Sequence, residues 1–338
     1  MSFANLKKGF PFLFRFSGLV KIKPVSNFEY SLKKKNSKKE FKVREFVSSD
    51  SEKKPVIFLL HGMSGYGIYD PRIYDLATNL CHSGYTVICP ELEEVKLLKI
   101  TVETIENIQT LYQLILEKYK NRKIAYFSVS FSAGMGLTAL AKENIPVMML
   151  VGGFYNIMNI SGFVVSNYHI DDYGTNVLFY NFIDKVEQKY LSLKEYFYQA
   201  ALDNGLHRKN KNPQAPTIFM KLSTVEKDFL KQIESSSKLR KQIAEEISSQ
   251  MREPSKSISP EYRINSIKAK ISILHGKNDY VIPESESILL SNSLKFFNKE
   301  HNLQITGLLD HGDKVSYINK IHEIPNLAKS FGYFFNNL

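Results

Sequence analysis

The sequence predicts an α/β fold with a mostly parallel central sheet flanked by helices. Short apolar runs alternate with longer helical patterns along most of the chain, which is typical of parallel strands joined by crossover helices. Several runs are apolar almost throughout, for example residues 55–62 and 124–129, and this indicates strands buried in a sheet. With 338 residues, 43% of them hydrophobic, the chain can form one large core with an insertion rather than two independent domains.

The alternation places the elements of this core. Strands are expected at 55–62, 85–90, 123–129, 146–152, 269–275 and 302–309, and helices at 71–83, 101–120, 131–142, 283–297 and 325–336. Between these parts the alternation stops, although 175–203 and 222–252 look helical. Before the core, 28–35 and 40–48 alternate like a hairpin. We therefore expect a basic N-terminal strap and hairpin at 1–54, a core at 55–153 and 266–338, and a helical cap inserted at 154–265.

The segment from Lys123 to Gly136 contains the strongest candidate for a catalytic residue. Its apolar strand pattern ends in small residues and then continues as a helix. Ser130 stands at the corner, and the residues two positions away on each side, Ser128 and Ser132, are small. This is the steric pattern of a nucleophile elbow, a turn so tight that only small side chains fit at those positions. Serines here replace the usual glycines.

Ser132 is an alternative nucleophile, because it also has small residues on both sides, Ser130 and Gly134. Strand length favours Ser130. Seven residues from Lys123 reach it, a usual length before such a turn, whereas Ser132 needs two more. The alignment of Ser132 with the central serine of Gly-x-Ser-x-Gly stays open.

The candidate partners of the serine follow it in the chain in a defined order. The strand at 55–62 ends in His61-Gly62, and a loop of small residues follows. Downstream, the strand at 269–275 leads to Asp279, and the strand at 302–309 leads to His311. Serine, then aspartate, then histidine is the triad order of α/β-hydrolases, and over residues 55–338 the chain resembles that superfamily.

The resemblance is closest to a little-characterised bacterial branch of esterase-like proteins. Four segments carry it: Asp70-Pro-Arg72, Ser-Phe-Ser-Ala-Gly134, Val151-Gly-Gly-Phe-Tyr-Asn156 and Asp172-Tyr-Gly174. In that branch the sequence of the turn looks like Ser-Phe-Gly-Ala-Gly, so the resemblance also implies that Ser130 is the nucleophile. The resemblance implies an α/β-hydrolase fold with a helical cap before the strand that carries the catalytic aspartate. It implies no particular substrate.

Each candidate has a distinct chemical role. A serine hydroxyl is a weak nucleophile until a base removes its proton. His311, in a small polar loop, is the base that we expect, with His322 as the alternative. Asp279 would fix the tautomer of that histidine and stabilise its charged form. The oxyanion hole is expected from the backbone N–H groups of Met63 and Phe131.

Other histidines and aspartates near these positions have structural interpretations. His61 and His275 each close a strand before a glycine, where a histidine more often holds the turn by hydrogen bonds. Asp310 and Asp313 flank His311 in the sequence and should point away from its ring, so we expect them to cap the loop.

Together these residues predict a carboxylic ester hydrolase that cleaves an ester or thioester through an acyl-serine intermediate. The insertion is rich in aromatic residues, which predicts an apolar acyl pocket. The same triad would serve an acyltransferase. A catalytically silent binding protein is a second alternative, because the elbow glycines are missing.

Composition narrows the remaining possibilities. No metal-ligand spacing, phosphate loop or dinucleotide fingerprint occurs, so we expect no metal and no cofactor. Residues 1–55 hold 14 Lys and Arg against 5 Asp and Glu, most of the net charge of +11. We expect this basic, phenylalanine-rich start to pack on the core, with peripheral contact to an anionic membrane face as the alternative. No nucleic-acid motif accompanies the charge. We expect Cys81 and Cys89 to be buried thiols in a cytoplasmic protein.

Overall fold

A computed structural model describes residues 3–34, 39–48, 54–186, 188–205, 212–309 and 323–338. In these residues eight strands form one sheet: β1 (Ser26–Lys33), β2 (Glu40–Val47), β3 (Val56–Leu60), β4 (Thr86–Pro90), β5 (Ile124–Val129), β6 (Val147–Val151), β7 (Lys270–Gly276) and β8 (His301–Thr306). Their order across the sheet is β1-β2-β4-β3-β5-β6-β7-β8. β2 pairs antiparallel with β1 and β4, and the pairs from β4 to β8 are parallel. The predicted mostly parallel sheet is confirmed.

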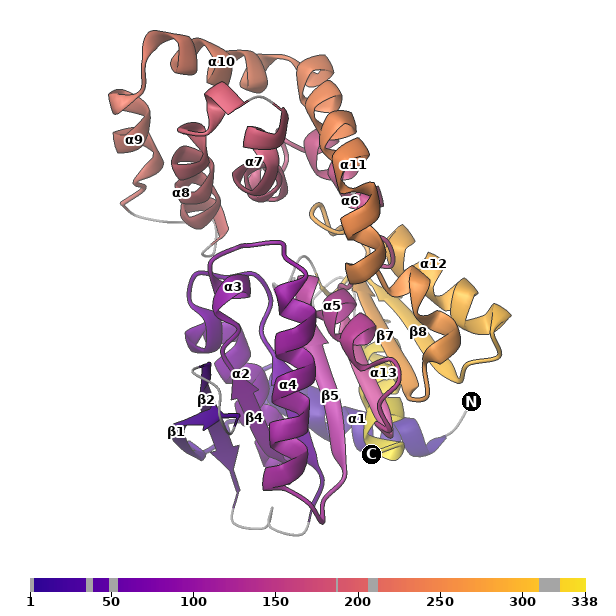
Figure 1. Ribbon diagram of the computed structural model, residues 1–338. Helices are drawn as coiled ribbons and strands as arrows, with labels where there is room; N and C mark the ends of the chain where they lie inside the picture. The colour runs from indigo at the N-terminus through magenta and orange to yellow at the C-terminus, as the bar shows by residue number, and fades with distance from the viewer. Residues whose placement is uncertain (1–2, 35–38, 49–53, 187, 206–211, 310–322) are drawn as a thin grey trace.

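Helices flank the sheet (Figure 1): α1 (Phe3–Phe16), α2 (Pro71–His82), α3 (Glu93–Lys96), α4 (Glu103–Lys118), α5 (Phe131–Leu140), α12 (Glu284–Phe296) and α13 (Ile324–Asn336). The side chains of β3 divide between two buried clusters. Val56, Phe58 and Leu60 pack in a cluster with residues of α4, α5 and α12. Ile57 and Leu59 pack in a cluster with residues of α1, α2 and α13. Successive side chains of a strand face opposite sides, so a strand covered on both faces is apolar throughout.

An insertion of helices lies between β6 and β7 and stands over one end of the sheet (Figure 1): α6 (Met158–Ser166), α7 (Tyr173–Val186), α8 (Leu193–Gly205), α9 (Ala215–Lys221), α10 (Thr224–Ser235) and α11 (Ser237–Ile258). Short 3₁₀ helices complete the described elements: η1 (Gly67–Tyr69), η2 (Gln188–Tyr190), η3 (Pro260–Tyr262) and η4 (Ile264–Ser266). The insertion has its own buried cluster, which includes Phe179, Phe197 and Ile243. The division of the chain into core and cap at 154 and 265 remains a proposal.

The helices of the insertion are shorter and more numerous than the sequence pattern predicts. Residues 175–203 divide into α7 and α8, and residues 222–252 fall mainly in α10 and α11. Capping side chains explain the second division. Ser223 and Glu226 form a reciprocal capping box at the start of α10, and the Ser236 side chain accepts the Leu239 N–H at the start of α11. Ser236, in an extended conformation, is both the C-cap of α10 and the N-cap of α11, so the helical run divides there.

The basic N-terminal strap is a helix, α1, that packs on α13. The Phe12 ring is fully buried, and its centroid lies 4.5 Å from that of Phe331. A Cβ atom at Gly9 would lie 1.8 Å from the Ala328 carbonyl oxygen, so the two helices touch backbone to backbone there. The expected packing of this segment on the core is therefore what the structure contains.

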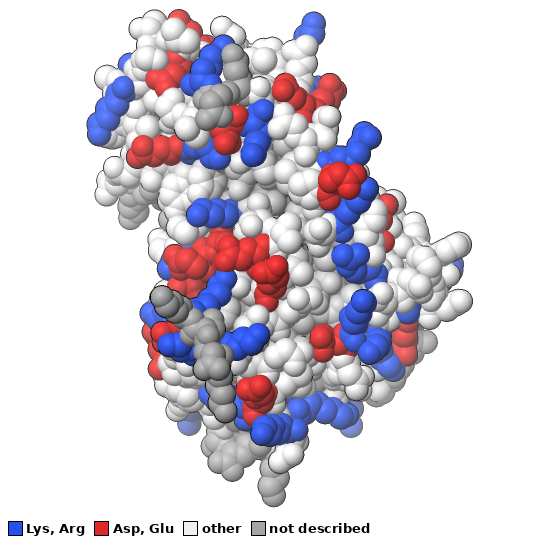
Figure 2. Space-filling view, in the orientation of Figure 1, with Lys and Arg blue, Asp and Glu red and all other residues white. Residues whose placement is uncertain are grey.

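The surface shows where charge and apolar groups remain. Lys7, Lys8 and Phe14 of α1 are exposed, and contact of α1 with an anionic membrane stays a prediction. None of the described helices is long and apolar enough to cross a membrane. On the face in Figure 2, acidic and basic side chains are interspersed, so this face is not one continuous basic surface. Cys81 and Cys89 are both buried free thiols, as predicted.

Phe12→Ala is expected to lower the free energy of unfolding by about 3–5 kcal/mol, because it leaves a cavity between α1 and α13. Phe14→Ala is the matched control, since that side chain is 47% exposed, and it should cost less than about 1 kcal/mol. Urea unfolding measures both variants. Equal losses would contradict the packing of α1 on α13.

Candidate active site

Ser130 lies in a strained turn between β5 and α5. Its backbone dihedrals are φ 56° and ψ −135°. For a residue other than glycine, a positive φ costs of order 1–3 kcal/mol, and this conformation persists only where the surroundings enforce it. Here the Ser130 N–H donates to the Val151 carbonyl at 2.7 Å, and the Ser130 carbonyl accepts the Ala133 N–H at 2.9 Å. The turn has the strained strand-to-helix form of a nucleophile elbow.

The other two serines of the turn are enclosed by protein. Ser132 Oγ donates to the His61 carbonyl at 2.5 Å, and its side chain is fully buried. Ser128 is also fully buried. Ser130, in contrast, is partly exposed and lines a cavity. The geometry therefore favours Ser130 over Ser132 as the serine that meets a substrate.

Close backbone contacts explain the small residues around this turn. A Cβ atom at Gly62 would lie 3.1 Å from Ser130 Cβ, so the loop after β3 runs directly beside the serine. A Cβ atom at Gly134 would lie 2.6 Å from the Phe154 ring, which is too short for any side chain. The core is packed so densely here that a methyl group at Gly134 would displace its neighbour.

His61 holds the loop that follows β3. Its Nε2 accepts the Leu92 N–H at 3.2 Å, so the ring proton is on Nδ1, which donates to the Gly62 carbonyl at 2.8 Å. This arrangement needs the neutral ring, and burial lowers the pKa of His61. The interpretation of His61 as a residue that holds its turn is confirmed.

Met63 and Phe131, the expected backbone donors, line the same cavity as Ser130. Phe131 is the first residue of α5, where an N–H has no partner within the helix and the helix dipole is positive. Met63 is held from the insertion, because the Tyr173 hydroxyl in α7 donates to the Met63 carbonyl at 2.9 Å. No sequence pattern predicted that Tyr173 holds this loop. Its place in the Asp172-Tyr-Gly174 segment was the available signal.

Asp279 is buried in the loop after β7. Its Oδ1 accepts the N–H groups of Val281 and Ile282, both at 2.9 Å. His275 Nε2 lies 3.6 Å from Asp279 Oδ2, yet the same nitrogen lies 2.9 Å from the Ile282 carbonyl. The other ring nitrogen of His275 lies 2.6 Å from the Ser287 hydroxyl. His275 therefore holds its own turn, as predicted.

The structure brings Ser130 and Asp279 to the same edge of the sheet. Ser130 binds the Val151 carbonyl at the end of β6. The next residue is Gly152, where a Cβ atom would lie 3.6 Å from Asp279 Oδ2. Residues 151–152 therefore lie between the two candidates, with the serine on one side and the carboxylate on the other.

The expected base and its neighbours lie outside the described residues: His311, His322, Asp310 and Asp313. The described chain places both ends of their segment. Thr306 Oγ1 and the Gly307 N–H donate to Glu323 Oε2, at 2.7 and 2.5 Å. The Lys277 N–H donates to the Thr306 carbonyl at 2.8 Å, so these ends lie beside the loop that carries Asp279.

Glu286 is a buried residue that no sequence pattern predicted to be part of the site. Its carboxylate accepts the N–H groups of Tyr155 and Asn156, at 2.9 and 2.8 Å, and the side-chain amide of Asn159 at 2.8 Å. These bonds fasten the start of α6, and with it the start of the insertion, to α12. The first contact spans 131 positions in the sequence, which no local pattern reveals.

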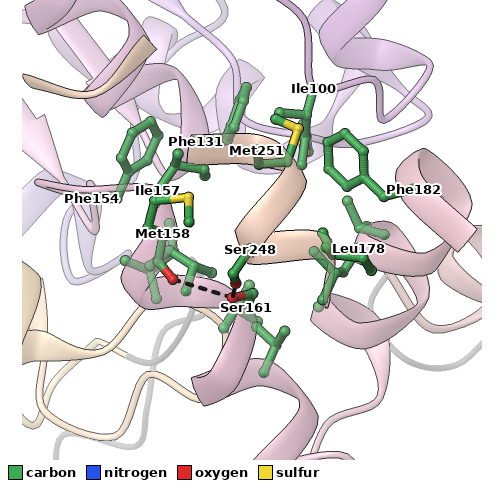
Figure 3. Close-up of a pocket in the computed structure, with 18 of the residues that line it drawn as sticks. Ile100, Phe131, Phe154, Ile157, Met158, Ser161, Leu178, Phe182, Ser248 and Met251 are labelled. Atoms are coloured by element: carbon green, nitrogen blue, oxygen red, sulfur yellow. Dashed lines mark hydrogen bonds between the residues drawn. The ribbon is translucent and has the colours of Figure 1, made fainter. Parts of the chain in front are cut away.

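An apolar cavity opens beside Ser130. Figure 3 shows the rings of Phe131, Phe154 and Phe182 around it, together with residues of α6, α7 and α11. None of the described residues that line it is charged. Within the described part of the chain, no group of three or more His, Cys, Asp or Glu side chains could hold a metal ion. The insertion thus supplies much of a pocket for an apolar group beside the candidate nucleophile.

Solved structures share this architecture. An acylaminoacyl peptidase from Pyrococcus horikoshii has a TM-score of 0.54 at 16% identity, over 95% of this chain and 43% of the peptidase. An esterase from Pyrococcus furiosus has a TM-score of 0.52 at 12% identity, over 94% of each chain. A 2-hydroxy-6-oxo-6-phenylhexa-2,4-dienoate hydrolase from a Rhodococcus strain has a TM-score of 0.50 at 15% identity, over 91% of this chain and 99% of that one.

These likenesses concern the fold. The chain spans less than half the length of the peptidase. No protein-family model matches the chain, and no curated protein matches it in sequence. The strand order, the inserted helices and the structural neighbours confirm the predicted α/β-hydrolase fold.

His61 is expected to make stability depend on pH. In an unfolded chain the pKa of histidine is about 6.5, whereas burial lowers the pKa of His61 in the native state. Below that pH the unfolded chain binds a proton that the native chain does not. The free energy of unfolding should therefore fall as pH falls, by up to about 1.4 kcal/mol per pH unit from this group.

Urea unfolding of wild type and His61→Gln between about pH 5 and about pH 7.5 measures this contribution. The variant should show the shallower dependence on pH. Identical slopes would mean that His61 does not stay neutral in the native state.

Proposed function

We propose that this chain, with its α/β-hydrolase fold, is a serine hydrolase that cleaves a carboxylic ester or thioester through an acyl-Ser130 intermediate. One observation carries the proposal: Ser130, at φ 56° between a parallel strand and a helix, lines an apolar cavity. Backbone strain of this kind concentrates at functional sites, because it persists only where the fold enforces it. A nucleophile elbow uses the same strain to expose its hydroxyl.

In the proposed reaction the Ser130 hydroxyl attacks the substrate carbonyl carbon while His311 accepts the hydroxyl proton. Asp279, with one oxygen already bound by two backbone N–H groups, orients His311 and stabilises its charged form. His311 then gives the proton to the leaving alcohol or thiol, which departs from acyl-Ser130. Water, deprotonated by His311, attacks the acyl carbonyl, so that the acid leaves and the serine regains its proton.

The negative charge that develops on the carbonyl oxygen would be stabilised by the N–H groups of Met63 and Phe131. Such donors work best when they are already held in position. The Tyr173 hydroxyl supports this arrangement, because its bond to the Met63 carbonyl restricts the peptide unit beside the expected donor. The insertion would then support the reaction centre as well as the pocket.

The cavity supports an apolar acyl group. Its described lining is uncharged and mostly hydrocarbon, which suits an alkyl chain better than a peptide with its polar backbone. Each buried methylene contributes up to about 0.8 kcal/mol, so medium-chain esters should be better substrates than acetyl esters. An acyltransferase would use the same residues, with an alcohol or thiol in place of water.

Ser130→Ala is expected to abolish covalent labelling by a fluorophosphonate and turnover of p-nitrophenyl esters, because both need that hydroxyl. Ser132→Ala is the matched control on the same turn. It should keep labelling and lose about 1 kcal/mol of stability with its hydrogen bond to the His61 carbonyl. If Ser130→Ala labels and Ser132→Ala does not, Ser132 is the nucleophile. A wild-type protein that never labels would favour a silent binding protein.

Asp279→Asn and His311→Ala are each expected to lower turnover by about a thousandfold or more, because triad members act as a unit. Asp310→Asn and Asp313→Asn are the controls and should cost far less. Turnover should rise with pH through neutrality as His311 loses its proton. A rate that is flat between about pH 5 and about pH 8 would argue against a histidine base.

A further inference from the structure

Two serine hydroxyls interrupt the otherwise apolar wall of the cavity. Among the described lining residues, Ser130, Ser161, Tyr173 and Ser248 carry a side-chain oxygen. Ser130 is assigned to the reaction, and the Tyr173 hydroxyl donates to Met63. Ser161 in α6 and Ser248 in α11 remain, and their Oγ atoms lie 2.5 Å apart (Figure 3). Where an apolar pocket has only a few polar groups, those groups usually determine which ligand it binds.

The serine pair, Ser161 and Ser248, can form a further hydrogen bond to a ligand. Ser161 Oγ also lies 3.2 Å from the Met158 carbonyl. If Ser248 donates to Ser161, then Ser161 donates to Met158, and the Ser248 oxygen can accept a further donor. If Ser161 donates to Ser248 instead, the Ser248 hydrogen is available to an acceptor. A ligand hydroxyl matches either arrangement, because it is both donor and acceptor.

The serine pair lies away from the candidate reaction centre. Figure 3 shows it where α6 and α11 meet, with Phe131 toward the other side of the cavity. Phe131 follows Ser130 directly in the sequence. A group bound to the pair would therefore lie several bonds from a carbonyl carbon held at Ser130.

We infer that the cavity takes an acyl chain that carries a hydroxyl group several carbons from its carbonyl. This inference rests on the proposed function and names its substrate class. A hydroxyl buried in an apolar cavity without a partner costs free energy, and a hydrogen bond to the serine pair offsets that cost. A plain chain also fits, because the two serines then stay bonded to each other. The distinguishing property is position: the hydroxyl is accepted at one carbon and disfavoured at its neighbours.

The test compares plain p-nitrophenyl decanoate with a series of p-nitrophenyl hydroxydecanoates. The hydroxyl stands at successive carbons along the chain, beyond the positions at which it would attack its own ester and form a ring. In wild type, kcat/KM relative to the plain ester should reach a maximum at one hydroxyl position, about tenfold above the neighbouring positions. Ser248→Ala should lower that maximum, taken relative to plain decanoate with the same variant, about fivefold or more. Ser166→Ala is the matched control on the exposed side of α6 and should leave the profile unchanged.

Two results would overturn the inference. One is a wild-type profile without a maximum, which would leave the serine pair as a contact between helices. The other is a maximum that survives Ser248→Ala. If thermal unfolding shows that Ser248→Ala does not fold, Ser161→Ala takes its place. The first of the two results depends on the wild-type protein alone.

Binding of the free hydroxydecanoic acids to Ser130→Ala, measured by calorimetry, separates this inference from the proposed function. If the chain is not a serine hydrolase, wild type will neither label nor turn over any ester. The ranking of Kd values should still have its optimum at one hydroxyl position. A ranking without an optimum would overturn the inference even where the esters are cleaved.

Discussion

Hydrogen bonds between neighbouring strands continue past the ends of β5 and β6, and the candidate site depends on them. The Ser130 N–H donates to the Val151 carbonyl, and the Gly152 N–H donates to the Leu274 carbonyl at 2.8 Å. The first bond holds Ser130, the residue after β5, in place at positive φ while the chain turns into α5. The sheet itself, rather than a flexible loop, thus sets the position of the serine relative to the loop that carries Asp279.

Two of the contacts between the insertion and the core bear directly on this edge. Glu286 binds the chain where the insertion begins, and Tyr173 binds the loop that carries Met63. Both groups are buried, so each hydrogen bond would be costly to leave unmade. A shift of α7 would therefore disturb the loop beside Ser130 as well as the wall of the cavity. Pocket shape and the geometry at the serine are physically linked.

Local patterns predicted the sheet and its crossover helices, because alternation and continuous apolar runs record which faces are buried. They also located the turn at Ser130, since small residues at fixed spacing are a steric requirement. The helix α1 was expected only as a strap, because its partner is α13 and Pro11 interrupts the pattern. Helix α6 was missed, and so were the roles of Tyr173 and Glu286. The contacts of these two residues join parts of the chain more than a hundred positions apart.

The pairing of α1 with α13 has a consequence for how the protein is made. Lys8 Nζ donates to the Phe335 carbonyl, 327 positions along the chain. At a synthesis rate of 5–20 residues per second, α1 leaves the ribosome roughly 15 to 65 seconds before the residues that cover it. During that interval Phe12 and Leu13 have no surface on α13 to pack against. α1 is therefore made long before it can dock on α13, and until then the nascent chain presents a basic, apolar segment that chaperones can hold.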